Sequence, residues 1–256
     1  MFDLFITAAT ALAGAMVLLW LISIWRGHVS FIDAFWGTGF IVAAGATAWL
    51  LPALGLEQTI ALILLTAWGL RLSIYLLKRY LRNGEDLRYV KILGSRTGAA
   101  RHLFSLWFVF GLQGVLILII VSPVIGILAA SPSSPDGWTI LGASVWAIGA
   151  FFEWIGDWQL SRFKANPDNE GKVLNTGLWA LTRHPNYFGD ACVWWGLWLV
   201  GHDITLVFAP ALMTFLLMKW SGVPLLERGL KKRRPGYADY INRTNAFFPG
   251  PPKNKA

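Results

Sequence analysis

The stretch FDLFITAATALAGAMVLLWLISIW, residues 2–25, carries a single charged side chain, Asp3. About 20 consecutive apolar residues are enough for an α-helix to cross a bilayer, so this stretch predicts a transmembrane helix. It has neither a basic start nor a clear cleavage site of small residues, so we expect a permanent helix rather than a signal peptide. Further apolar runs follow at 30–51, 58–80, 103–129, 138–160, 187–201 and 203–220.

These runs together predict an all-α, polytopic integral membrane protein with about seven transmembrane helices in one domain, residues 1–256. The chain is 55% apolar and only 14% charged, whereas soluble domains are about 25% charged. This composition excludes an ordinary soluble domain. The single cysteine, Cys192, excludes an internal disulfide framework and a multi-cysteine zinc site, and we expect no metal.

The basic residues are distributed unevenly. Of the 22 Lys and Arg residues, 21 lie in or beside the segments 26–29, 81–102, 161–186 and 221–256, and the exception is Arg71. Because cytoplasmic loops are enriched in Lys and Arg, this pattern predicts an outside N-terminus and a cytoplasmic C-terminus. The net charge of +8 then suits a face against anionic lipid, so we expect membrane lipids and no nucleic acid as partners. No protein partner is evident.

Five ionisable residues lie inside the apolar runs, all in the predicted cytoplasmic half of the bilayer. Charged groups at such depth are costly and usually face a bundle interior. They favour a polar cavity open to the cytoplasm, with a purely structural ion-pair network as the alternative. The five are Asp33, Arg71, Glu153, Asp157 and Asp190.

Three polar segments lie at predicted membrane boundaries. TGLWALTRHPNYFGD, residues 176–190, enters the sixth apolar run, and its basic groups and helix start suit an anionic ligand. RNGEDLRY, residues 82–89, lies in an inner loop, and SGVPLLERGLKKRRPGYADYINRTNAFFP, residues 221–249, forms the tail. The alternatives for the three segments are an interface anchor, a solvated charged loop and a tail that binds lipid headgroups.

In these segments the chain resembles the membrane steroid 5α-reductase family, specifically its bacterial branch. The resemblance rests on FIDAFWG at 31–37, RNGEDLRY at 82–89, the run from Asp157 through LSRFK, TGLWALTRHPNYFGD at 176–190 and GVPLLERGLKKRRPGYADYINRTNAFFP at 222–249. It implies a seven-helix enzyme in a bacterial inner membrane, with a cytoplasm-facing cofactor site. It also implies NADPH-dependent reduction of the C4–C5 double bond of a 3-oxo-4-ene steroid or a similar enone lipid.

The resemblance also assigns roles to residues. The segments 81–102, 161–186 and 221–256 would carry cofactor-binding loops. The residues implied in cofactor binding are Arg71, Arg82, Asn83, Arg88, Asp157, Lys164, Arg183, His184, Asn186, Tyr187, Asp190 and Tyr240. At the substrate end the chain departs from the animal enzymes, which carry a Gln-Glu pair in helix two and a Tyr in helix three. Here the predicted catalytic residues are Asp33, Trp36 and Tyr75.

The implied chemistry needs a hydrogen-bond donor. Hydride attack at the β-carbon of an enone builds negative charge on the carbonyl oxygen, and a donor aimed at that oxygen lowers the barrier. Asp33 would serve if it stayed protonated, and Tyr75 would serve without a change of pKa. The sequence leaves open the proton donor, NADPH versus NADH, the physiological substrate and the oligomeric state.

Two other functions remain open. A membrane methyltransferase of the isoprenylcysteine carboxyl methyltransferase type, which uses S-adenosylmethionine, also has an Arg-His-Pro-Tyr-Gly type motif entering a late helix. Glu227 and the Gly-Tyr pattern at 236–240 fit that family too. A small non-enzymatic transporter is the third alternative, although the predicted outer halves of the helices carry no charged path and the chain shows no inverted repeat.

Overall fold

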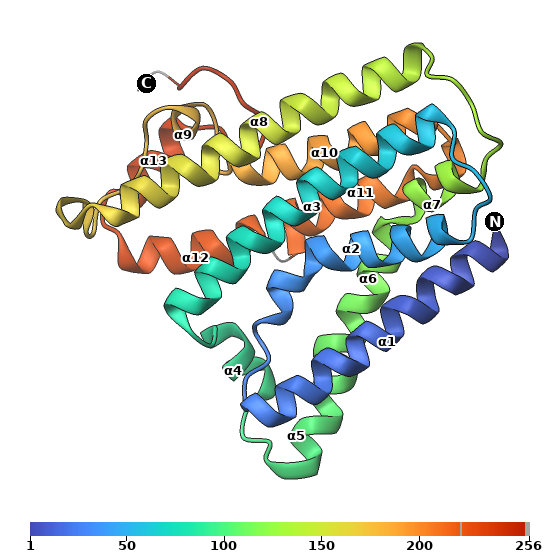
Figure 1. Ribbon diagram of the computed structural model, residues 1–256. Helices are drawn as coiled ribbons and strands as arrows, with labels where there is room; N and C mark the ends of the chain where they lie inside the picture. Colours follow the sequence, from blue (N-terminus) through green and yellow to red (C-terminus); the bar gives the residue numbers. More distant parts are fainter. Residues whose placement is uncertain (221, 254–256) are drawn as a thin grey trace. The chain divides into compact units, whose positions relative to one another are not determined.

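In the computed structural model, which describes residues 1–220 and 222–253, the chain is built from helices (Figure 1). The described residues contain no strand, and a single isolated parallel bridge joins Thr182 to Asn245. The helices form two compact units, Met1–Asp136 and Gly137–Ala256, which are described in turn. The predicted all-α fold is confirmed.

The first unit holds the N-terminal helices. Its elements are α1 (Phe2–Arg26), α2 (Ile32–Trp49), α3 (Leu56–Asn83), α4 (Leu87–Leu93), α5 (Gly98–Ser105), the π-helix η1 (Leu106–Gly111), α6 (Leu112–Ile120) and α7 (Ser122–Ala129). Helix α2 packs against both α1 and α3 (Figure 1). Gly37 on α2 and Gly69 on α3 face each other, and a Cβ added at Gly69 would lie 2.7 Å from the carbonyl oxygen of Gly37. Small residues therefore bring the two backbones into contact, as in other membrane helix pairs.

The fourth apolar run is not one straight helix. Helices α5, η1 and α6 follow one another without a break from Gly98 to Ile120, and α7 starts anew at Ser122. Pro123 lies in the first turn of α7. A proline has no backbone N–H and clashes with the carbonyl four residues earlier, so it is tolerated at a helix start and interrupts a helix interior.

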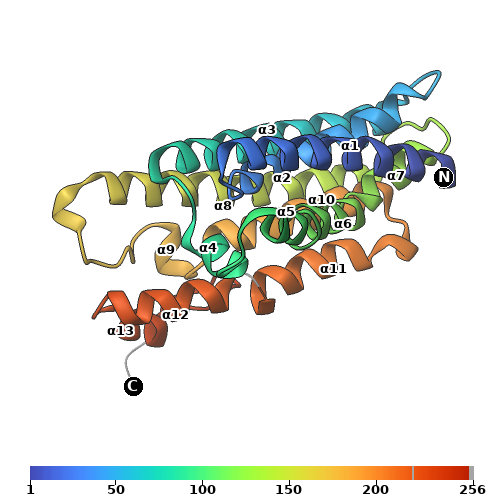
Figure 2. The same ribbon diagram turned by 90° about the horizontal axis from the view of Figure 1, so that it is seen from below.

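The second unit holds the C-terminal helices. Its elements are α8 (Gly137–Ala165), η2 (Pro167–Asn169), α9 (Leu178–Leu181), α10 (Pro185–Gly201), η3 (Ile204–Leu206), α11 (Phe208–Phe215), the π-helix η4 (Leu216–Trp220), α12 (Val223–Arg233) and α13 (Tyr237–Arg243). Figure 2 shows α12 and α13 following α11 along one edge of this unit. Between the apolar runs 187–201 and 203–220, the short helix η3 separates His202 from α11.

Helices α8 and α10 make the main contact of this unit through glycines spaced by seven. Gly142 and Gly149 on α8 lie against Gly196 and Gly189 on α10. A Cβ on any of the four would lie within 2.7 Å of backbone atoms of the other helix. A seven-residue period keeps the glycines on one face of each helix over two turns. Glycine at these four positions therefore allows the backbones of α8 and α10 to approach each other unusually closely.

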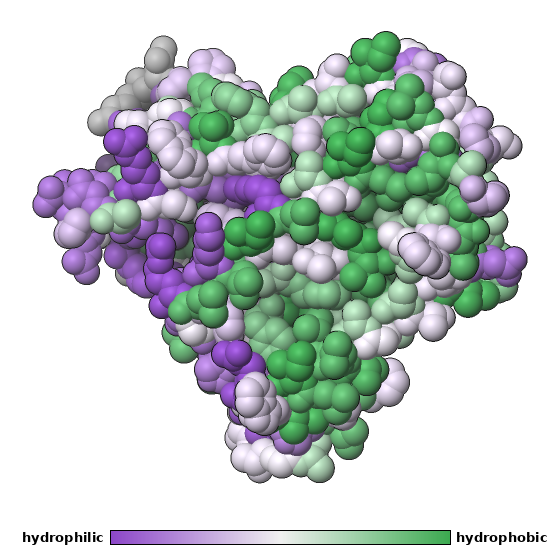
Figure 3. Space-filling model, in the orientation of Figure 1, coloured by the Kyte–Doolittle hydropathy of each residue, from purple (hydrophilic) through white to green (hydrophobic). Residues whose placement is uncertain are grey.

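Among the described residues, four helices are long and apolar enough to cross a membrane: Phe2–Arg26, Leu56–Asn83, Gly98–Ile120 and Gly137–Ala165. A shorter apolar helix runs over Ile204–Trp220. Large apolar side chains on the first unit are exposed, with Trp25 at 84% and Trp49 at 89%. In Figure 3 hydrophobic side chains cover the surface over α1 and α5 to α6. Exposed apolar surface of this extent is typical of helices that face lipid.

The segments that were expected to be loops contain short helices. The segment 81–102 holds α4 and the start of α5, 161–186 holds the end of α8 together with η2 and α9, and the tail holds α12 and α13. In Figure 3 hydrophilic residues gather over the C-terminal end of α8 and the loop after it. Polar segments thus follow the apolar helices, as the sequence predicts, but each of these segments contains short helices.

Candidate functional site

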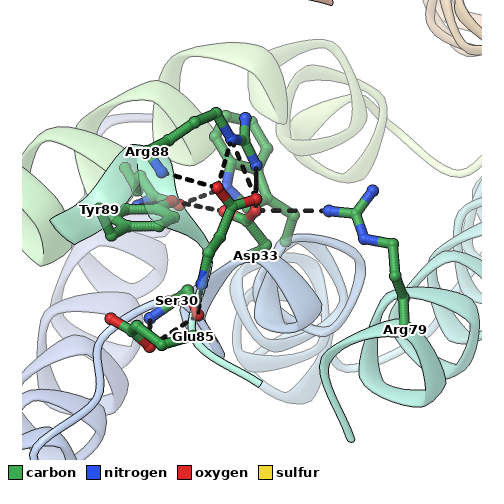
Figure 4. Close-up of polar contacts among 9 residues, drawn as sticks. Ser30, Asp33, Arg79, Glu85, Arg88 and Tyr89 are labelled. Carbon is green, nitrogen blue, oxygen red and sulfur yellow. Dashed lines mark hydrogen bonds and ion pairs between the residues drawn. The ribbon is translucent and has the colours of Figure 1, made fainter. Parts of the chain in front are cut away.

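In the first unit, Asp33 is the centre of a polar cluster that joins α2, α3 and α4 (Figure 4). One carboxylate oxygen lies 3.0 Å from Nη2 of Arg88 and 3.7 Å from Nη2 of Arg79. The other accepts a hydrogen bond from the Tyr89 hydroxyl at 2.5 Å. To act as a proton donor, Asp33 would have to give up one of these interactions, because both of its oxygens are acceptors here.

A chain of buried hydrogen bonds continues from this cluster toward α6. The Tyr89 hydroxyl accepts a hydrogen bond from the Gln113 side-chain amide at 3.1 Å, and Gln113 Oε1 accepts one from the indole N–H of Trp36 at 2.5 Å. Tyr89 and Gln113 are buried. Burial raises the pKa of Tyr89, and the neighbouring Asp33 carboxylate adds to this rise. The hydroxyl is therefore held in its neutral, donating form.

The motif RNGEDLRY binds the turn that precedes α2. Glu85 accepts hydrogen bonds from the backbone N–H of Val29 at 3.0 Å, from that of Ser30 at 3.1 Å and from the Ser30 hydroxyl at 2.7 Å. Ser30 Oγ in turn accepts one from the backbone N–H of Asp86 at 3.1 Å. These contacts satisfy the polar groups of Val29 and Ser30 in the turn before the helix. Glu85 thus ties the segment after α3 to the turn that leads into α2.

Asp86 caps the start of α4. Its carboxylate accepts a hydrogen bond from the backbone N–H of Arg88 at 2.8 Å and pairs with the Arg88 guanidinium at 2.9 Å. Burial acts to raise the pKa of Asp86, but the hydrogen bonds and charge of Arg88 outweigh it and hold that pKa below its usual value. Arg88 therefore bridges two carboxylates, Asp33 and Asp86, from the two motifs.

In the second unit, a buried cluster forms where the chain enters α10. Glu227 on α12 accepts a hydrogen bond from Nε of Arg183 at 2.7 Å, and its Oε1 lies 3.1 Å from Nε2 of His184. The His184 ring stacks on Tyr187 with 5.4 Å between ring centroids. Burial acts to raise the pKa of Glu227, but the hydrogen bonds and charges of His184 and Arg183 outweigh it and lower the pKa to about 2.

The tail closes over this turn. Arg183 also donates from Nη1 to the carbonyl oxygens of Thr244 at 2.7 Å and Ile241 at 3.2 Å. The backbone N–H of Arg183 donates to the carbonyl of Asn245 at 2.9 Å. The buried Tyr240 donates its hydroxyl to the carbonyl of Trp179 at 2.6 Å. The tail is thus part of the folded core of this unit.

Asp157 and Asn186 meet between α8 and α10. The Asn186 side-chain amide donates to Asp157 Oδ1 at 3.1 Å, and Asp157 is only 3% exposed. Gly156 makes room for this contact, since a Cβ there would lie 3.1 Å from the Pro185 ring. The residue next to Asp157 is therefore small because the start of α10 packs directly against it.

A family model described as "Protein of unknown function (DUF1295)" matches residues 19–244. The chain belongs to the DUF1295 family. The match takes in both polar clusters, from Ser30 in the first unit to Thr244 in the second. The description of DUF1295 assigns no activity to its members.

Two relatives are similar to this DUF1295 protein. The "Uncharacterized protein C594.04c" of Schizosaccharomyces pombe is 23% identical over 265 residues, which cover 90% of this chain and 75% of the relative. The "Probable O-methyltransferase ustE" of Ustilaginoidea virens is 31% identical over 94 residues, or 36% of this chain and 32% of the relative. No solved structure matches the chain.

The two units of this DUF1295 protein divide the predicted site residues between them. In the first unit, Arg88 contacts Asp33, and the guanidinium of Arg71 lies 5.1 Å from the ring centroid of Tyr75. Arg82 and Asn83 are exposed in the last turn of α3. Within this unit, the structure therefore brings together some of the predicted residues and leaves others at the surface.

In the second unit, Lys164 is exposed near the end of α8, and Asp190 lies one turn beyond Asn186 on α10. Arg183 and Tyr240 bind carbonyl groups of their own chain. These contacts give both residues a part in holding the tail, whatever else they bind. Their predicted contact with a cofactor stays a prediction.

Sequence reasoning missed several residues of the two clusters. Gln113 went unnoticed inside an apolar run, although a lone amide there is itself a signal of a buried hydrogen bond. The sequence predicts a loop at Tyr89 and Glu85, and it places Glu227 in the tail. Their partners are 24 to 56 positions away in the sequence, so no local pattern reveals them.

Proposed function

We propose that this protein is an NADPH-dependent reductase of an enone lipid, such as a 3-oxo-4-ene steroid. The hydrogen bond between Asp157 and Asn186 carries the proposal. The resemblance to membrane steroid reductases assigns both residues to the nucleotide, and they come from different helices, 29 positions apart. The structure brings the two side chains into contact at a buried position, which supports a shared role in ligand binding.

The residues of the second unit suit a dinucleotide chemically. A buried carboxylate such as that of Asp157 accepts hydrogen bonds from ribose hydroxyls, as acidic residues do in soluble dinucleotide sites. Lys164 and Lys172 are exposed at and after the end of α8, where they supply positive charge for phosphates. When bound, NADPH supplies the hydride. The chain's own part is to hold the nucleotide and to exclude water from it.

We assign the predicted catalytic residues Asp33, Trp36 and Tyr75 of the first unit to the lipid substrate. Negative charge on the carbonyl oxygen of an enone is stabilised by a fixed hydrogen-bond donor, and the loss of one such donor costs roughly 10²–10³ in rate. Tyr75 offers a phenolic donor. Tyr89 orients Asp33 through a hydrogen bond and so belongs with this group as a positioning residue.

The proposed topology follows the basic residues. We propose seven membrane spans, with α2, α10 and α11–η4 in addition to the four long apolar helices, an outside N-terminus and a cytoplasmic C-terminus. Helix α10 has 17 residues, short for a span. The orientation places the basic ends of α3 and α8 in the cytoplasm, where NADPH is available to a bacterial inner-membrane enzyme.

A membrane methyltransferase that uses S-adenosylmethionine is the second candidate. One observation favours it: the partial similarity to a protein named "Probable O-methyltransferase ustE". The His184–Glu227 pair fits either function, because a carboxylate that binds one imidazole nitrogen leaves the other to face a ligand.

Ligand binding to the detergent-purified protein separates the two candidates. Thermal stability is measured with NADPH, NADH or S-adenosylmethionine, where a ligand at 100 times its dissociation constant stabilises the fold by about 2.7 kcal/mol. The reductase predicts a shift with NADPH that is lost in Asp157→Asn and Asn186→Ala. Asp3→Asn, an exposed acid in the first turn of α1, is the matched control and keeps the shift. A shift with S-adenosylmethionine alone would replace the reductase with the methyltransferase.

A further inference from the structure

A cavity of about 300 Å³ lies within the second unit, at the C-terminal end of α8. The cavity is open to solvent, and its lining includes two aromatic residues, one arginine and three amide residues: Trp158, Phe163, Arg162, Gln159, Asn166 and Asn169. None of these residues belongs to the clusters described above. The volume is at the lower end for small-molecule sites, so the cavity suits one ring system with its sugar rather than a whole dinucleotide.

The wall of the cavity pairs a cation with an aromatic ring. Arg162 and Trp158 are four residues apart on α8, and the guanidinium carbon of Arg162 lies 5.6 Å from the indole centroid. Side chains at this spacing share one helix face. A guanidinium is a flat cation that stacks on ring systems and binds phosphate oxygens, and an indole offers a stacking face to a base. A flat ring that carries a nearby anionic group fits this wall.

The loop around the cavity is fixed by its own hydrogen bonds. Gln159 Oε1 accepts from the backbone N–H of Leu178 at 3.1 Å, and Asn169 Nδ2 donates to the carbonyl of Phe163 at 3.0 Å. Gly177, next to this contact, has φ +61, and a Cβ there would lie 2.4 Å from Gln159 Nε2. The position therefore requires glycine, and the loop is shaped before any ligand binds.

These contacts leave complementary groups for a ligand. Within the residues that the structure describes, Gln159 Nε2 donates no hydrogen bond and Asn169 Oδ1 accepts none. An amide donor and an amide acceptor are the two kinds of group that an adenine ring can bind at its edge, because the ring has a nitrogen that accepts beside an amino group that donates. The residues that line the cavity thus supply an aromatic ring, an amide donor, an amide acceptor and a cation.

We propose that this cavity binds the adenosine end of the cofactor. Arg162 lies five residues beyond Asp157 on α8, about 7.5 Å along the helix at 1.5 Å per residue. The adenosine would therefore occupy the outer end of the same helix that carries the buried carboxylate. The inference rests on the proposed function for its choice of NADPH, but S-adenosylmethionine carries the same adenosine group, so the site does not depend on which candidate is correct.

The test compares ligands with and without adenosine on the full chain in lipid nanodiscs. Dissociation constants are measured for NADPH, for reduced nicotinamide mononucleotide, which lacks adenosine, and for S-adenosylhomocysteine. Arg162→Ala and Trp158→Ala should each weaken NADPH about tenfold, or about 1.4 kcal/mol, and leave the mononucleotide unchanged. Arg26→Ala, an exposed arginine in the last turn of α1 and outside the cavity, is the matched control and should not change either value.

Each outcome decides one question. If the wild-type protein binds NADPH and both variants keep its affinity, or lose NADPH and the mononucleotide equally, the adenosine site is wrong and the reductase stands. If the wild type binds only S-adenosylhomocysteine and the variants weaken it, the site stands and the reductase is wrong. If it binds none of the three, both proposals fall. Arg162→Ala decides the matter alone if Trp158→Ala does not fold.

Discussion

The hydroxyl of Tyr89 lies 2.5 Å from Oδ1 of Asp33 and joins two sequence motifs that are 56 positions apart. FIDAFWG contributes Asp33 from the first turn of α2, and RNGEDLRY contributes Tyr89 from α4. Arg88 of the second motif also binds Asp33, and Glu85 binds the turn just before the first motif. The two motifs therefore act as one structural feature of the first unit.

Removal of the Tyr89 hydroxyl should destabilise the protein. Tyr89→Phe removes the hydroxyl that binds Oδ1 of Asp33 and the amide of Gln113, and a buried polar group that loses its partner costs about 1–3 kcal/mol. Thermal unfolding in detergent measures the change. Tyr80→Phe, which loses only an exposed contact of 3.3 Å to His28, is the control. Equal stability of the two variants would show that the buried chain of hydrogen bonds contributes nothing.

Alanine at Gly149 or Gly189 should disrupt the α8–α10 pair. A Cβ at Gly149 would lie 2.6 Å from the Gly189 carbonyl oxygen, and one at Gly189 would lie 2.5 Å from that of Gly149. Overpacking of this kind costs about 1–3 kcal/mol or more. Gly45→Ala on α2 meets nothing within 4 Å and gains helix propensity, so its melting temperature should hold or rise. A melting temperature for Gly149→Ala that matches Gly45→Ala would contradict the close approach.

Glu227 should make the stability of the protein fall in acid. Its pKa is lowered from 4.5 to about 2, so its contribution is present above pH 4.5 and is lost as the pH falls toward 2. Melting temperatures of the wild type and Glu227→Gln are compared over that range. The variant should lose stability at neutral pH and show a flatter slope between the two values. Parallel curves would mean that Glu227 is not held by Arg183 and His184.

The proposed topology predicts which loops face outward. Ser134 lies in the exposed loop before α8, and Asn175 lies in the exposed loop before α9. With Cys192→Ser as the background, Ser134→Cys should react with an impermeant maleimide on intact cells, and Asn175→Cys only after the cells are opened. The reverse pattern would invert the orientation, and labelling of both on intact cells would contradict the number of spans between them.

The apolar helices are the part of the fold that the sequence predicts well. The expected runs 2–25, 58–80 and 138–160 correspond to Phe2–Arg26, Leu56–Asn83 and Gly137–Ala165. Mean hydropathy detects such helices because every face of them is apolar. It does not detect α4 or α12, which carry charges on one face, and these helices lie in segments that were expected to be loops.

Individual residues of the candidate site could be predicted from the sequence, but the contacts between them could not. Charged residues within apolar runs, such as Asp33 and Asp157, are visible in the sequence because they are costly in a bilayer. The partners of these two residues, Tyr89 and Asn186, are not visible in the sequence. They lie on other helices and come into contact only when those helices pack together. Arg183 illustrates the limit most clearly: its basic charge suggested an anion, whereas the structure surrounds it with Glu227 and backbone carbonyls of the tail.

Mass spectrometry of one reaction tests the central claim most directly. The protein in nanodiscs is incubated with a 3-oxo-4-ene steroid, NADPH deuterated at C4 of the nicotinamide and S-adenosylmethionine with a labelled methyl group. The reductase predicts a saturated product that carries deuterium at the former β-carbon, and loss of this product in Asp157→Asn. A lipid that instead acquires the labelled methyl group, with no deuterium transfer, would contradict the reductase and identify a methyltransferase.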